Sequence, residues 1–183
     1  MLPILKYFWQ MCLLRSGPDR IPSQPLILVL ALIFYLLADV VGGSLARPSQ
    51  SIASVLGIGL IDATIFGVVT FLLLSFMNLS GRFIATYTAL LGTGIFMVVI
   101  QVPFILIRYT ETSILMFFAE SVALVCFGWW LVIIGHIYHR AANISILQGS
   151  AIGLVIMILI ATAVFMAFPP PQQIQQFIRP SAL

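Results

Sequence analysis

The stretch PLILVLALIFYLLADVVGGSL, residues 25–45, decides the fold class. It contains no Lys or Arg, and its one charged residue is Asp39. A helix of about 20 residues rises about 30 Å, which is the thickness of the hydrocarbon core of a bilayer. The sequence therefore predicts that this segment crosses a membrane.

Four more apolar stretches of similar length follow, separated by short polar breaks. We expect the five spans at residues 25–45, 52–77, 83–107, 113–137 and 146–168. Short breaks make consecutive spans run antiparallel. Of all residues, 62% are hydrophobic and 7% are charged, whereas soluble domains have about 25% charged residues. The prediction is an all-α, polytopic transmembrane helical bundle.

The two ends of the chain differ from this membrane domain, which we place at residues 25–168. Residues 1–24 contain an apolar segment that is too short to cross, with Lys6 and Trp9 in it, followed by a proline-rich loop. Aromatic and basic residues suit the headgroup boundary, so we expect an interfacial amphipathic helix. The alternative is a simple extension of the bundle. Residues 169–183 form a Pro/Gln-rich tail, expected to be extended and then frayed.

The orientation follows from the basic residues in the loops. Five lie on the side of the N-terminus and three on the other side, namely Lys6, Arg15, Arg20, Arg82 and Arg140 against Arg47, Arg108 and Arg179. This bias predicts a multi-pass protein with a cytoplasmic N-terminus and an outside C-terminus, in a bacterial inner membrane.

Three acidic residues lie inside the predicted spans without a Lys or Arg in the same span, namely Asp39, Asp62 and Glu120. From the helix rise, Asp39 lies about 20 Å from the inner face, and Asp62 and Glu120 lie about 15 Å and 10 Å from the outer face. The three carboxyls thus share one layer and form a cluster if the fourth span packs beside the first two. Arg47 or Arg108 could reach Asp39 and pair with it.

Several roles for these acids stay open. A protonated carboxyl donates a hydrogen bond between helices, which is a structural role. The functional alternative is a proton or cation pathway that opens from outside. A contact with a partner subunit or a lipid headgroup is the third possibility.

Small residues recur every four positions on two spans, which allows helices to approach closely in lipid. We predict helix-packing faces at Gly59, Ala63 and Gly67 and at Gly149 and Gly153. Packing within the bundle ranks before packing between protomers.

No motif for catalysis, cofactor binding or nucleic-acid binding is recognisable. The sequence has no nucleophile elbow, zinc-protease motif, phosphate-binding loop or Lys/Arg cluster. His136 and His139 share a helix face, but further ligands at matching depth are missing, so we predict contacts with headgroups or a neighbouring loop. Cys12 and Cys126 are expected to be free thiols. We therefore predict no enzyme, no cofactor and no metal.

The chain resembles the Yip family of five-span membrane proteins. The resemblance rests on the number of spans, on GPDRIP at residues 17–22, and on FGWWLVIIGHIYHRAANISILQGSAIGLVIMILI at residues 127–160. Eukaryotic members act in early secretory membranes and bind Rab-type GTPases through a long hydrophilic N-terminal region. Since this chain lacks that region, the resemblance implies a bacterial-type relative, and no binding residue is carried over.

These observations favour a non-enzymatic membrane scaffold or accessory subunit that works through helix packing. Its expected partners are the lipid bilayer and either other membrane subunits or a second copy of itself. The competing prediction is a small channel or a proton-coupled transporter that uses Asp39, Asp62 and Glu120.

Overall fold

The computed structural model describes residues 2–18, 24–109 and 112–169, with side chains from residue 6 onward. Five of its helices are long and apolar enough to cross a membrane, with mean hydropathy between 2.1 and 2.5. The predicted all-α bundle with five candidate spans is therefore confirmed. Its elements are α1 (Leu2–Cys12), α2 (Pro25–Ala46), α3 (Ile52–Phe76), the 3-10 helix η2 (Ser80–Arg82), α4 (Phe83–Ile107), α5 (Ser113–Ala142) and α6 (Ile146–Ala167). The tail beyond residue 169 and residues 19–23 of the proline-rich loop lie outside the described residues.

The helix ends agree with the predicted spans to within one residue, except at the end of α5. This helix continues five residues past the predicted end at Ile137, and Tyr138, Ala141 and Ala142 in the extension are buried. It ends where Asn143 adopts a left-handed conformation with φ of 56°, a common way to end a helix. Hydropathy underestimated the length of α5, because its last turns include polar residues that are covered by protein.

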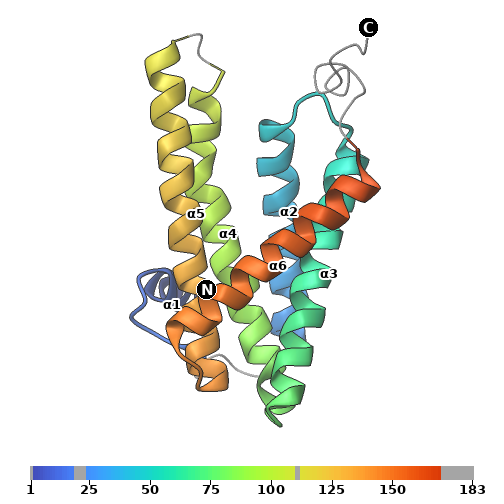
Figure 1. Cartoon of the computed structure of the whole chain (residues 1–183), viewed down its shortest axis with the longest axis vertical. Coiled ribbons are helices and arrows are strands. Elements are labelled where there is room, and N and C mark those ends of the chain that lie inside the picture. The colour runs from blue at the N-terminus through green and yellow to red at the C-terminus, as the bar shows by residue number, and fades with distance from the viewer. Residues whose placement is uncertain (1, 19–23, 110–111, 170–183) are drawn as a thin grey trace, which may run out of the picture.

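Helix α2 packs most extensively against α4, and α6 crosses over α5 and α3. In Figure 1, α4 and α5 run together on one side, α2 and α3 lie on the other, and α6 crosses diagonally in front of them. Helix α4 packs against α1, α2, α3 and α5 and is the centre of the bundle. Its residues 85–94 are all buried, so this segment forms the core.

The short N-terminal helix α1 is present as predicted, but one of its faces packs into the bundle. Met11 and Cys12 are buried, and Trp9 packs against Phe96 with ring centroids 6.1 Å apart. The ring of Phe8 covers Gly92, which lies nine residues, or about 14 Å, into α4. The packing fits the alternative of a bundle extension, and Lys6 and Leu13 are exposed.

Candidate functional site

Two of the three intramembrane acids meet at the interface between α2 and α3. The hydroxyl of Tyr35 on α2 donates a hydrogen bond to the carboxylate of Asp62 on α3. One turn further along α2, the carboxyl of Asp39 lies directly over Gly59, so that a methyl group at Gly59 would overlap its Oδ2 atom. Residues four apart on a helix share a face, which explains why α2 presents both Tyr35 and Asp39 to α3.

A second tyrosine reaches this interface from α4. The hydroxyl of Tyr87 donates to the backbone carbonyl of Ala63 over 2.6 Å, and its ring lies against Gly67. Gly59 therefore faces α2, whereas Ala63 and Gly67 face α4. The small residues of α3 admit side chains from two different neighbouring helices.

Arg47, at the end of α2, is the basic residue that acts on Asp39. Arg47 follows the last residue of α2, is exposed, and attracts the Asp39 carboxyl electrostatically without the close contact of an ion pair. Arg108 lies exposed just beyond α4. Of the two predicted charge partners, only Arg47 acts on Asp39.

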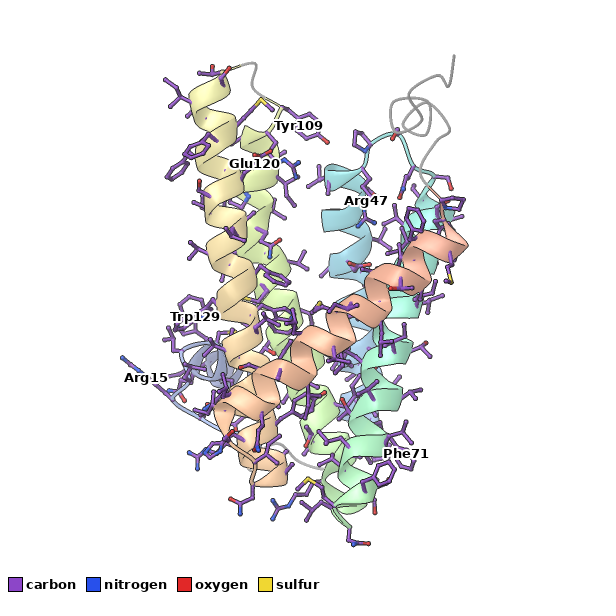
Figure 2. The ribbon with its side chains drawn as sticks, viewed as in Figure 1. Arg15, Arg47, Phe71, Tyr109, Glu120 and Trp129 are labelled. Atoms are coloured by element: carbon purple, nitrogen blue, oxygen red, sulfur yellow. The ribbon has the colours of Figure 1, made fainter. Side chains whose placement is uncertain are left out.

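The third acid does not join the other two. Glu120 lies on α5, which packs mainly against α4 and α6, and its side chain is exposed. Arg47 acts electrostatically on Asp39, and Tyr35 and Asp39 act on Asp62, whereas Glu120 acts on neither. The condition for a three-acid cluster, that the fourth span packs beside the first two at this level, is therefore not met. Figure 2 shows Glu120 on the pair of helices opposite Arg47.

A small cavity lies beside the Tyr35–Asp62 hydrogen bond. Its volume of about 10 Å³ is at the lower limit for holding one water molecule. The cavity is lined by Tyr35, Ala63, Phe66, Tyr87, Leu90, Leu91 and Trp130. Neither Asp39 nor Asp62 belongs to this lining, and six of the seven lining side chains contact other buried groups of the core or the acid interface. The cavity is thus a packing space at the centre of the bundle.

Helix α5 also holds the N-terminal segment in place through two ring nitrogens. The indole Nε1 of Trp129 donates to the carbonyl of Cys12 over 3.1 Å, and Nε2 of His136 lies 3.2 Å from the carbonyl of Ser16. These carbonyls belong to the end of α1 and the turn after it, where the helix cannot satisfy them itself. Burial raises the pKa of the Cys12 thiol to about 11, and both cysteines are free. His136 contacts a neighbouring loop, which is one of the two contacts predicted for it.

The tightest helix contact lies between α5 and α6. A Cβ atom at Gly149 would lie 2.7 Å from the carbonyl oxygen of Gly135, so the two backbones touch. One turn along α6, Gly153 packs against Ile134, and Ser150 Oγ donates to the carbonyl of Leu131 over 3.0 Å. Here the backbone groups of the two helices come as close as glycine permits.

Sequence reasoning named the acids but not the hydroxyl groups that form hydrogen bonds between the spans, of which Tyr35 binds an acid. Tyr35, Tyr87 and the buried pair Thr70–Tyr138, whose oxygens are 2.8 Å apart, were not singled out. A usable signal exists, since a hydroxyl in a span needs a hydrogen-bond partner. Tyr35 also lies one turn from Asp39 on the same helix.

Comparison with family models, curated proteins and solved structures finds no match for this chain. Within the described residues, no three His, Cys, Asp or Glu side chains come together as metal ligands would. The class of protein is therefore defined by the fold. It is an integral membrane protein, a multi-pass helical bundle with polar contacts inside.

Proposed function

We propose that this protein is a non-enzymatic membrane-embedded scaffold or accessory subunit. It acts through helix packing and through contacts with lipids or partner subunits. The observation that carries the proposal is the packing of two partly buried acids between α2 and α3. Asp62 binds Tyr35 of the neighbouring helix, and Asp39 packs on Gly59, so both carboxyls join α2 to α3.

The cavity supports the same proposal. A pathway for ions needs a wetted route that touches the acids, whereas this cavity holds about one water and its lining contains neither acid. Polar contacts between helices are worth about 0.6 kcal/mol on average in membranes and up to about 1.7 kcal/mol. That is sufficient for a role in holding helices together.

The competing function is a proton-coupled transporter or small channel, and one observation favours it. Asp39, Tyr35, Asp62 and Tyr87 are within electrostatic reach of one another in a single interface. Such chains of titratable groups occur in proton relays. Glu120, the third acid of that hypothesis, lies outside this group.

Flux through reconstituted vesicles separates the two functions. Proteoliposomes with wild-type protein and with Asp62→Asn are loaded with a pH-sensitive dye and given a proton gradient, with monovalent cations tested in parallel. We expect both proteins to give the flux of empty vesicles. Proton or cation flux in the wild type that Asp62→Asn abolishes would contradict the scaffold proposal.

A matched pair of glycines tests the structural role of the acid interface. Gly59→Ala forces the Asp39 carboxyl to move and should lower the melting temperature of the purified protein. Gly81→Ala, at a loop position where a methyl group meets nothing within 4 Å, should leave it unchanged. Equal melting temperatures would remove the proposed role of Asp39 between α2 and α3.

We further propose that the N-terminus is cytoplasmic, on the ratio of five to three basic residues. A membrane-impermeant thiol reagent on intact cells should label Ser49→Cys in the α2–α3 loop but not Gly81→Cys in the α3–α4 loop. Labelling of Gly81→Cys alone would reverse the orientation. The bacterial inner membrane and the relation to the Yip family stay predictions, and a pull-down from native membranes with a tagged chain would identify the partner.

A further inference from the structure

The first half of α5, residues 113–129, is the least covered part of any candidate span. Among these residues only Ala119 is buried. Phe117 and Leu124 are 75% and 72% exposed. We call this segment the open half of α5. Figure 2 shows its beginning at the end of the molecule where Tyr109 and Glu120 lie.

A glycine in the open half has no neighbour. Ten glycines of the five spans other than Gly128 each meet an atom of another element or a distant side chain within 4 Å of a built Cβ. Gly128 meets nothing within that distance. In membrane helices glycine serves close approach of another backbone, and at Gly128 this approach is not made within the described chain.

The open half also exposes a carboxyl. Glu120 lies about 10 Å from the start of α5, after the apolar residues 114–118 that place it below the membrane boundary. A charged group that faces lipid costs roughly 3 kcal/mol on insertion scales. A protein contact that supplies a hydrogen bond removes much of this cost.

These residues share one face. Phe117, Glu120, Leu124 and Gly128 follow the three- and four-residue spacing of a helix–helix seam. The seam points away from α4, because Ala119, Val122 and Cys126 occupy the covered side of α5. It is a continuous contact face with large residues beside a small one.

We propose that this seam binds the same seam of a second copy of the chain, as a parallel α5–α5 contact. The inference deepens the proposed scaffold function and rests on it. A twofold axis along the membrane normal places each residue opposite itself at equal depth. Glycine on glycine permits close backbones. The proposed contact pairs Glu120 with Glu120 of the partner subunit through one shared proton, since two carboxylates would repel each other. Both features fit a second copy better than an unrelated helix, which would have to bring a matching donor to this depth.

Cysteine cross-linking in vesicles tests the geometry. Leu124→Cys lies on the seam, and Val155→Cys lies exposed on α6 as the matched control, both in a Cys126→Ser background. Oxidation should give a covalent dimer for Leu124→Cys at least several-fold more than for Val155→Cys. Equal cross-linking at the two positions overturns the proposal.

Single-molecule photobleaching of labelled protein, diluted in lipid, tests the energetics. We expect dimers for the wild type, and a roughly tenfold weaker association for Glu120→Leu and for Gly128→Leu. Glu120→Gln keeps a donor and an acceptor and should stay dimeric. A wild type that is monomeric at high protein-to-lipid ratio, or a Gly128→Leu variant that dimerises as the wild type does, overturns the proposal.

The two proposals fail separately. A monomer that passes no ions overturns the dimer and leaves the scaffold function standing, whereas a dimer with Asp62-dependent flux does the reverse. Capture of a different membrane helix on the seam, without dimers, also overturns the second-copy assignment. Melting temperatures of Glu120→Leu and Gly128→Leu should match the wild-type monomer, which shows that the variants fold.

Discussion

The two halves of α5 have similar composition and opposite environments. Residues 113–129, the open half, have one buried side chain, while residues 133–138 in the second half are all buried. We call residues 130–142 the packed half. Lipid tails are as apolar as leucine, so hydrophobicity alone does not decide which half meets protein. The difference lies in what the other elements offer, since α3, α6 and the turn after α1 all contact the packed half.

The glycines show the same contrast most directly. In the packed half Gly135 touches the backbone of α6 at Gly149, and in the open half Gly128 touches nothing. The same residue type thus serves intramolecular packing in one place and is left without a contact in the other.

The largest effect is expected for Gly149→Leu. Its Cβ would lie 2.7 Å from a backbone oxygen, and backbone cannot rotate away, so α5 and α6 must separate. Overpacking typically costs about 1–3 kcal/mol and more where backbone must move, so we expect loss of the monodisperse peak in size-exclusion chromatography. Gly128→Leu, the control, should elute and melt as the wild-type monomer. If the two variants behave alike, the contrast between the halves is wrong.

The next effect concerns an acid with a partner inside the chain. Asp62→Asn keeps an acceptor for Tyr35, whereas Asp62→Lys places a cation deep in the membrane at a cost of roughly 3 kcal/mol. We expect near-normal membrane yield for Asp62→Asn and a strongly reduced yield for Asp62→Lys, measured by quantitative blotting of membrane fractions. Comparable yields would count against a deep position of Asp62.

A smaller effect is expected from a buried hydroxyl pair. Tyr138→Phe removes the 2.8 Å contact with Thr70, which joins the packed half of α5 to α3, and should lower stability by about 1 kcal/mol. Ser121→Ala in the open half removes a bond within its own helix and should change stability little. Unfolding by denaturant in mixed micelles measures both. A larger loss for Ser121→Ala than for Tyr138→Phe would reverse the assignment of the halves.

The smallest effect is a change in thiol reactivity at the edge of the packed half. Burial raises the pKa of Cys12 from 9.0 to about 11, so at pH 7 the docked thiol should react slowly with maleimide. Trp129→Phe removes the hydrogen bond to the Cys12 carbonyl and should speed labelling several-fold, in a Cys126→Ser background. Trp130→Phe, whose ring packs on Phe66, is the control. Unchanged labelling in Trp129→Phe would show that this bond does not hold α1.

The Cys12 thiol also makes the stability of the folded state depend on pH. The folded chain keeps the Cys12 proton up to about pH 11, while an exposed thiol loses it near 9.0. The folded state therefore binds more protons between these values, and its stability falls as pH rises from about 9 to 11. Cys12→Ser should remove this part of the alkaline loss in a melting series. An identical alkaline loss in wild type and Cys12→Ser would contradict this.

Much of the fold could be predicted because it depends on local composition. An apolar run of about 20 residues identifies a span wherever it lies. The acids Asp39 and Asp62 could be placed next to each other because a short loop forces α2 and α3 to be neighbours. Glu120 could not be placed, because a third helix can pack on several sides of such a pair.

By itself, the sequence determined that the chain is a membrane bundle, where its spans begin and end apart from the end of α5, and which polar residues lie within them. Only the tertiary structure decided which of these polar residues meet: that Tyr35 binds Asp62, that Tyr138 reaches Thr70, that α1 enters the bundle, and that Gly128 and Glu120 stay uncovered. The reason is physical. Whether a segment enters the lipid depends on its own hydrophobicity, which the composition along the chain gives. Inside the lipid, which helices pack together depends on shape and on hydrogen bonds between residues far apart in sequence.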